Sequence, residues 1–177
     1  MSPLKFPLTL AIAILANLLA IAYCACASEK SSPLDGHWRL VQTEREAEER
    51  LRAIDEVIRH MRPFQQGKAR SRLVERTSPP PVLSISTADS VVSITYGTDH
   101  INLDLGGPPV EVSGKGGRAF VTAMMEGSLL VITARNGGGV RKTNYQVVND
   151  RLRVEATLSD ARLPKTLTYV SIYKTTE

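Results

Sequence analysis

A long series of short alternating runs fills the second half of the chain and constrains the fold more than any other feature. From Val82 onward, apolar and polar side chains alternate over short runs, with no helical period of useful length. Alternation with a period of two is typical of strands that have one buried and one wet face. The nine runs are VLSIS, SVVSITY, INLDL, PVEVS, RAFVTAMM, SLLVITAR, GVRKTNYQVV, RLRVEATLS and TLTYVSIYK.

Turn residues join these runs. The joints are TAD, GTDH, GGP, GKGG, EG, NGG, ND and DARLP, and most are short enough to link antiparallel neighbours. Strands spaced by about ten residues predict an antiparallel up-and-down meander. A long meander leaves its edges exposed, and closure into a barrel removes them. The sequence therefore predicts a mainly β protein whose sheet closes on itself.

A further strand and a helical insertion precede this meander. HWRLVQT alternates Trp38 and Leu40 with polar neighbours, which predicts a short first strand. The period then changes, and the following apolar residues share one helical face: Leu51, Ile54, Val57, Ile58 and Met61. Thr43 is the expected cap of this helix and Pro63 its expected end. FQQGKARSRLVERTS predicts a second helix, so the helical insertion spans about residues 43–76.

The amino terminus has the layout of a signal peptide over residues 1–27. Lys5 precedes the apolar run LTLAIAILANLLAIA, and the polar segment SEKSS follows. Ala25 and Ala27 fit the small-x-small cleavage pattern, which would leave Ser28 as the mature amino terminus. We therefore expect an exported protein, periplasmic or secreted, whose residues 28–177 form a single domain of a size that can bury its own core.

Two alternatives for this segment stay open. No charge interrupts the chain from Pro7 to Ala27, and about 20 such residues could span a bilayer as an uncleaved anchor. Cys24 or Cys26 could instead carry a lipid. Because the chain has no other cysteine, cleavage would leave a mature domain without disulfide, thiol nucleophile or cysteine metal ligand.

A search for reaction chemistry finds no motif. His37, His60 and His100 lie far apart with no i,i+4 pair, so we expect no metal site. SGKGGRAF lacks the residue order of a phosphate-binding loop, and no nucleophile motif is present. We predict no catalytic residue, no cofactor and no enzyme. The net charge of +4 comes from mixed-sign residues, which argues against a nucleic-acid partner and leaves membrane contact to an uncleaved leader or a lipid.

The order of strand, helical segment and nine further strands resembles the intracellular fatty-acid-binding proteins. Gly36-His37-Trp38 is similar to the G-x-W that opens lipocalins, and the whole chain resembles a group of small exported bacterial proteins that share this start and an LP-plus-aromatic ending. These likenesses imply a lipocalin-like, calycin-type barrel of about ten strands with the helical insertion after the first. In lipocalins the tryptophan closes the barrel floor beside a basic residue, which implies structural roles for Gly36 and Trp38 and a partner in Arg151 or Arg153.

The fatty-acid-binding likeness also implies a ligand inside the barrel. Its final strand carries an Arg-x-Tyr that holds a carboxylate, and Ser171-Ile172-Tyr173 stands at that place here. Since serine replaces the arginine, we expect a small apolar or weakly polar, lipid-like ligand to bind better than an acid. The candidate ligand-binding residues are Phe120, Met124, Leu130, Tyr169, Ser171 and Tyr173.

A second hypothesis is a non-enzymatic interaction or structural module of the cell envelope. In that case the barrel is filled, and a basic patch of Lys68, Arg70, Arg72 and Arg76 contacts acidic partners or lipid headgroups. The size of the inward side chains distinguishes the two hypotheses, because small residues would leave room for a ligand and large ones would fill the barrel.

Overall fold

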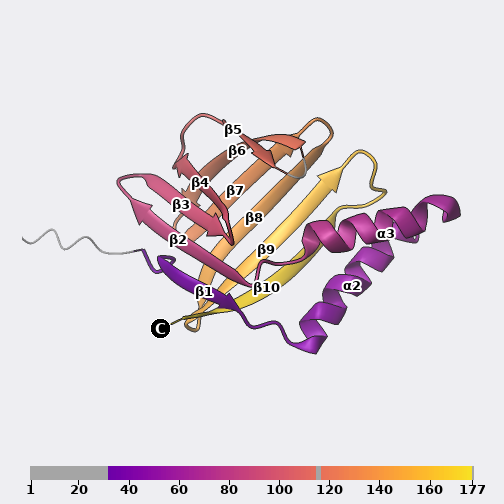
Figure 1. The fold of residues 1–177 in the computed structure, drawn as a ribbon, viewed down its shortest axis with the longest axis horizontal. Helices are drawn as coiled ribbons and strands as arrows, with labels where there is room; N and C mark the ends of the chain where they lie inside the picture. The colour runs from indigo at the N-terminus through magenta and orange to yellow at the C-terminus, as the bar shows by residue number, and fades with distance from the viewer. Residues whose placement is uncertain (1–31, 115–116, 177) are drawn as a thin grey trace, which may run out of the picture. The chain divides into compact units, whose positions relative to one another are not determined.

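The structure is a computed structural model that describes residues 32–114 and 117–176, so the predicted leader and its cleavage site lie outside the described residues. Ten strands and two helices make up the described chain (Figure 1). The strands are β1 (Gly36–Leu40), β2 (Val82–Ala88), β3 (Val91–Tyr96), β4 (Asp99–Asp104), β5 (Val110–Gly114), β6 (Gly117–Glu126), β7 (Leu129–Asn136), β8 (Gly139–Val148), β9 (Arg151–Asp160) and β10 (Leu167–Thr175). The helices, α2 (Glu44–Ile58) and α3 (Pro63–Thr77), lie between β1 and β2.

All ten strands belong to one antiparallel sheet that forms a nearly closed barrel. Their order is β4-β3-β2-β1-β10-β9-β8-β7-β6-β5, so β1 pairs with both β2 and the last strand. This confirms the predicted up-and-down meander of ten strands and the helical insertion after the first.

The joint between β4 and β5 is not the tight turn that its sequence indicated, because these two strands do not pair. Pro108 and Pro109 lack the backbone donor that a ladder needs. Before them, Leu105 forms a single bridge with Ala123 of β6, and the amide of Gly106 donates to the Ala123 carbonyl oxygen over 2.8 Å. The barrel is therefore nearly closed rather than continuous.

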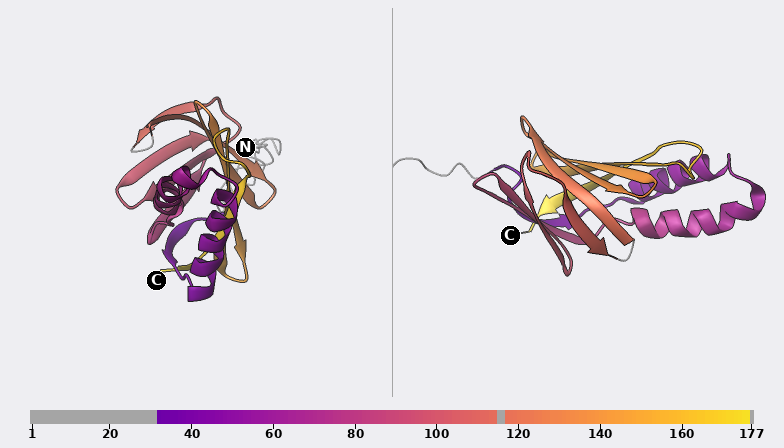
Figure 2. Two further views of the ribbon diagram at one scale, coloured as in Figure 1. Left: turned by 90° about the vertical axis from the view of Figure 1, so that its right-hand side faces the viewer. Right: turned by 90° about the horizontal axis from the view of Figure 1, so that it is seen from above.

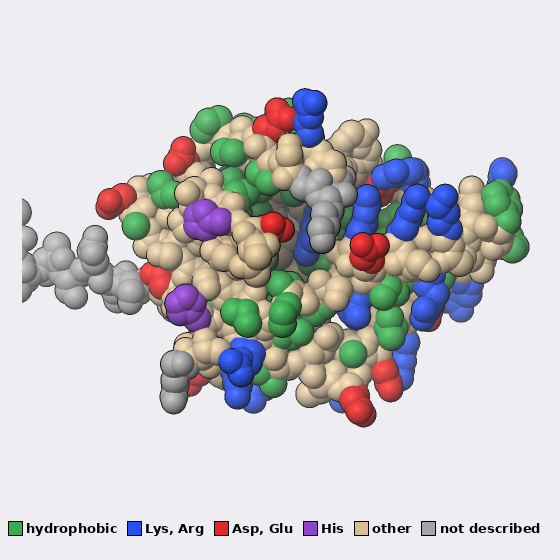
Figure 3. Space-filling view, in the orientation of Figure 1, with side chains coloured by type: hydrophobic (Ala, Val, Ile, Leu, Met, Phe, Trp, Pro, Cys, Tyr) green, Lys and Arg blue, Asp and Glu red, His purple; other side chains and the backbone are tan. Residues whose placement is uncertain are grey.

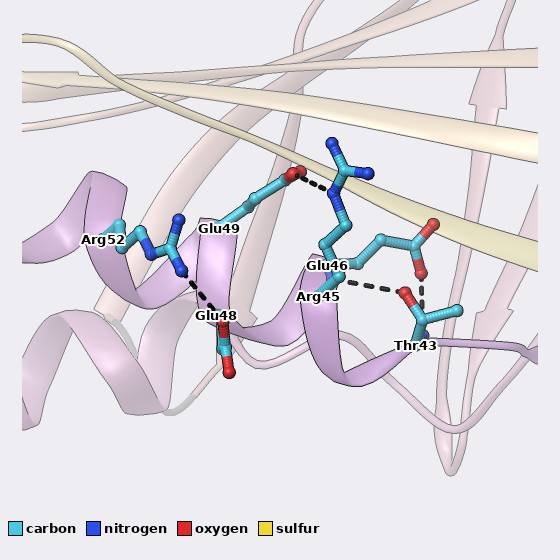
Figure 4. Close-up of polar contacts among 6 residues, drawn as sticks. All are labelled: Thr43, Arg45, Glu46, Glu48, Glu49 and Arg52. Atoms are coloured by element: carbon cyan, nitrogen blue, oxygen red, sulfur yellow. Dashed lines mark hydrogen bonds and ion pairs between the residues drawn. The ribbon is translucent and has the colours of Figure 1, made fainter.

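The first helix begins with a capping box at Thr43. The Thr43 hydroxyl accepts a hydrogen bond from the Glu46 amide at 3.3 Å, and the Glu46 carboxylate accepts one from the Thr43 amide at 2.8 Å (Figure 4). The ion pairs drawn beside it are Arg45–Glu49 and Arg52–Glu48. Pro63 occupies the first turn of α3, where its missing amide proton costs nothing. None of the helices in the described part of the chain is long and apolar enough to cross a membrane.

The larger core lies inside the barrel, around Trp38. Its indole is 3% exposed, and Nε1 donates to the Leu34 carbonyl oxygen at 2.9 Å. Gly36 has a φ of 143°, a value that residues with a Cβ atom rarely adopt, so the backbone conformation requires glycine here. The entry to β1 therefore combines a backbone constraint at Gly36 with a buried ring at Trp38.

A second, smaller core attaches the helices to one end of the barrel. Ile54, Val57 and Ile58 of α2 and Leu73 of α3 are buried against the start of β10 and the end of β9. The β residues in this core are Ala156, Leu167 and Tyr169. Figure 2 shows the two helices side by side at this end. We call it the helix end of the barrel.

Candidate functional site

The barrel interior is filled at one end and open at the other. Along the inward face, Leu130, Tyr145 and Tyr173 are between 0% and 2% exposed and belong to the barrel core. Nearer the helix end the inward positions are small, because Ala119 and Ala134 stand there. They line a cavity of about 200 Å³, which we call the mouth cavity.

Arg141 lies in this cavity. Odd-numbered residues of β8 face the barrel interior, as the burial of Thr143 and Tyr145 shows, and Arg141 continues that face toward the helix end. The Arg141 side chain is exposed, because solvent reaches it through the cavity. Among the residues that the structure describes, Arg141 forms no ion pair. The mouth cavity therefore contains a cation without a protein counter-charge in direct contact.

Four tyrosines influence the charge of this cation, and one of them lines the same cavity. Tyr169 lines the cavity, Tyr96 and Tyr145 share a hydrogen bond, and the Tyr173 hydroxyl donates to the Pro80 carbonyl oxygen at 3.2 Å. Burial raises the pKa values of Tyr96, Tyr145 and Tyr173, so these phenols stay neutral at physiological pH.

The charge of Arg141 persists in this setting. Burial of the guanidinium opposes the charged form, but the neighbouring phenols, Tyr169 first among them, leave the pKa of Arg141 raised. The mouth cavity thus offers the Arg141 cation together with the side chain of Tyr169, a combination suited to an oxyanion.

The rim of the mouth cavity carries one further cation and one carboxylate, Arg76 and Asp160. Asp160 accepts hydrogen bonds from the Arg162 guanidinium, at 2.6 Å for the shorter, and this contact lowers the pKa of Asp160 to about 2. Since the charge of Arg162 balances that of Asp160, Arg76 and Arg141 give the cavity a net positive charge.

A larger pocket of about 670 Å³ lies next to the mouth cavity, between α3 and the connection from β9 to β10. We call it the helix pocket. It shares Arg76, Leu158 and Asp160 with the mouth cavity, so the two are adjacent parts of one hollow. Figure 3 shows lysine and arginine side chains gathered over the helices on this face.

Four of the residues predicted to bind a ligand face the interior. Leu130 and Tyr173 are 0% and 1% exposed and lie in the filled part of the barrel, while Tyr169 lines the mouth cavity. Ser171 is 2% exposed, on the inward face of β10 between the two tyrosines. The structure therefore brings Tyr169 to the cavity and places the other three deeper in the barrel.

Phe120 and Met124 need correction, because they point out of the barrel and are 54% and 53% exposed. The alternate residues of β6, Val121 and Ala123, are buried inside instead. Both faces of RAFVTAMM are apolar, so the alternation pattern did not show which face of this strand points into the barrel. The inward face takes the smaller side chains, which fit the crowded interior.

Sequence reasoning missed Arg141, the residue at the centre of the site. A signal was present, because Arg141 and Lys142 are adjacent in a predicted strand and successive strand residues point to opposite faces. One of the two cations therefore had to face inward.

No protein-family model and no curated protein matches the sequence, but solved structures match the fold. A heat-soluble (SAHS) protein from Ramazzottius varieornatus aligns with a TM-score of 0.54 and 13% identity, over 82% of this chain and 96% of that one. The REP1-NXSQ fatty acid transporter aligns with a TM-score of 0.52 and 13% identity, over 81% and 96%. This chain folds as a calycin-type barrel. Human cRBP IV aligns with this calycin-type barrel with a TM-score of 0.52 and 11% identity, over 81% of this chain and 98% of that one. At such identities the likeness establishes the fold alone.

Proposed function

We propose that this protein is a non-enzymatic binding protein that holds the acidic group of a small amphipathic molecule in the mouth cavity. The observation that carries the proposal is Arg141, an inward cation without an ion-pair partner in the described chain, in a cavity that Tyr169 also lines. A carboxylate taken into such a site regains through charge-assisted hydrogen bonds what it loses in hydration.

This proposal changes the ligand polarity that the sequence suggested. Ser171 stands where fatty-acid-binding proteins have arginine, which favoured a neutral ligand. Arg141 of β8 supplies a cation instead. It pairs with Leu158 of β9, which in turn pairs with Leu167 at the start of β10. The positive charge has therefore a different position along the barrel, closer to the helix end.

Calorimetric titration with an acid and an alcohol of equal chain length tests the proposal. We expect saturable binding that favours the acid. In Arg141→Gln, acid affinity should fall by about 10- to 150-fold, the equivalent of a charged hydrogen bond of about 1.5–3 kcal/mol, while alcohol affinity changes little. Lys142→Gln is the matched control, because Lys142 is exposed on the outer face of the same strand.

Absence of saturable binding for either ligand would favour the interaction module instead. The filled inner end of the barrel is the observation that supports this second candidate. Its basic patch is divided, because Arg70 pairs with Asp55 at 2.7 Å while Lys68, Arg72 and Arg76 line the helix pocket.

We further propose that the protein is exported, on the basis of the signal-peptide pattern in residues 1–27. Intact-mass measurement on the protein from its source should give a chain that begins near Ser28. An uncleaved chain would indicate the membrane-anchored alternative, and a lipid on Cys24 or Cys26 would indicate the lipoprotein.

A further inference from the structure

We propose that the apolar chain of the ligand lies outside the barrel, in the helix pocket between α3 and the β9–β10 connection. This inference rests on the proposed function, because it takes the acidic group to be at Arg141. It names the binding site of the rest of the molecule and the class of ligand, a long-chain carboxylic acid.

Beyond the mouth cavity, the inward side chains in the described part of the barrel are closely packed. Two residues further along β8 from Arg141, Thr143 is 5% exposed, and the next inward residue, Tyr145, is 2% exposed. On the neighbouring β9, Leu152 is fully buried in the same core. A cavity of about 200 Å³ also falls below the usual volume of a complete ligand site, about 300–1,000 Å³. A chain attached to an acid at Arg141 must therefore leave toward the helices.

The helix pocket continues directly from that point. It shares Arg76, Leu158 and Asp160 with the mouth cavity, and its volume of about 670 Å³ lies within the usual range for ligands. Its remaining apolar lining residues are Met61, Phe64, Ala69, Leu73 and Leu163. Phe64 is 76% exposed, so a chain in the pocket would cover apolar surface that is now open to water.

The cations around the helix pocket favour an acid over a neutral ligand. Lys68, Arg72 and Arg76 follow one another at four-residue spacing, so they share one face of α3, and Arg162 lies on the opposite wall. Asp160, the only carboxylate that lines the described pocket, is paired with Arg162. The aliphatic stems of lysine and arginine can cover an acyl chain while their charged ends stay in water.

Spin-labelled fatty acids test the position of the chain directly. The nitroxide is placed near the carboxyl end in one probe and near the methyl end in the other, and methyl signals of the full-length mature protein are followed by NMR. We expect the methyl-end label to broaden the signals of Ala69 and Leu163. Broadening of Leu130 and Ala123 instead would place the chain inside the barrel and overturn the inference, while leaving the acid site at Arg141 intact.

Affinity across a series of acid chain lengths supplies a second test. Each methylene that enters the pocket should tighten binding about fourfold in the wild type. Ala69→Trp should place a large ring in the pocket, obstruct the path of the chain and reduce this gain while short acids still bind. Ser71→Trp is the matched control on an exposed position of the same helix, and it should keep the gain.

The outcomes separate the two proposals. A chain-length dependence in Ala69→Trp equal to that of the wild type, with a matching circular dichroism spectrum, would contradict the helix pocket. If the wild type binds no acid of any length, the proposed function itself fails. If Arg141→Gln loses acids of every length and Ala69→Trp loses only the long-chain gain, both hold.

Discussion

Replacement of Trp38 by alanine should destabilise the fold by about 3–5 kcal/mol, the range measured for buried large aromatic residues. The ring is 3% exposed in the barrel core. A buried tryptophan covers about 150–250 Å², which at about 25 cal/mol per Å² gives about 4–6 kcal/mol as an upper value. The alanine methyl group recovers part of this area, and the lost hydrogen bond to Leu34 adds about 1 kcal/mol.

Urea denaturation followed by far-ultraviolet circular dichroism is the appropriate assay, because Trp38 is the only tryptophan in the chain and its variants lose the fluorescence signal. Trp38→Phe should cost less than Trp38→Ala, since it keeps one aromatic ring and removes the second ring of the indole with its N–H donor. Phe120→Ala is the control, because that ring is 54% exposed and its loss should change stability by less than about 1 kcal/mol. A Trp38→Ala effect as small as the control would refute the role of the ring in the core.

Three further predictions concern charges and caps. Arg141→Met should leave the ligand-free protein equally or more stable to urea, because an apolar side chain replaces a cation held by no ion pair in the described chain; a loss above about 1 kcal/mol would contradict the site's electrostatics. The Arg162 contact lowers the pKa of Asp160 to about 2 from 3.8, so its stabilising effect is complete above pH 4 and is lost as the pH falls toward 2. The unfolding midpoint, measured as the pH is lowered, should therefore change less in Asp160→Asn than in the wild type. Thr43→Ala should cost about 1 kcal/mol in thermal or urea unfolding by removing the helix cap, whereas an unchanged midpoint would show that the cap is dispensable.

The barrel could be predicted from the sequence because the alternation of apolar and polar residues is repeated in strand after strand. In β9, Leu152 and Ala156 face inward, and the alternate residues Arg151 and Arg153 are polar, so the direction of that strand was evident. In β6 both faces are apolar, so the outward position of Phe120 depends on the space left by other strands, which no local pattern records.

The candidate site was less accessible to sequence reasoning for a different reason. The resemblance directed attention to position 171, where the expected arginine is missing. Arg141 comes from another strand, and it reaches the mouth cavity only through the register of β8 with β9. The adjacent charges of Arg141 and Lys142 showed that one must be inside, but the register was needed to find its neighbours.

The pairing of β1 with both β2 and β10 has a consequence for the order in which the protein folds. Trp38 lies opposite Thr175, and the Thr176 hydroxyl donates to the His37 carbonyl oxygen at 3.0 Å, a contact between residues 139 positions apart. A strand made at the start of synthesis thus gains its second neighbour only when the last strand has been made. Contacts of such long range slow folding, so the barrel should close late and in its final step. For the export that we propose, this delay would leave the chain more time in the unfolded state that membrane passage requires.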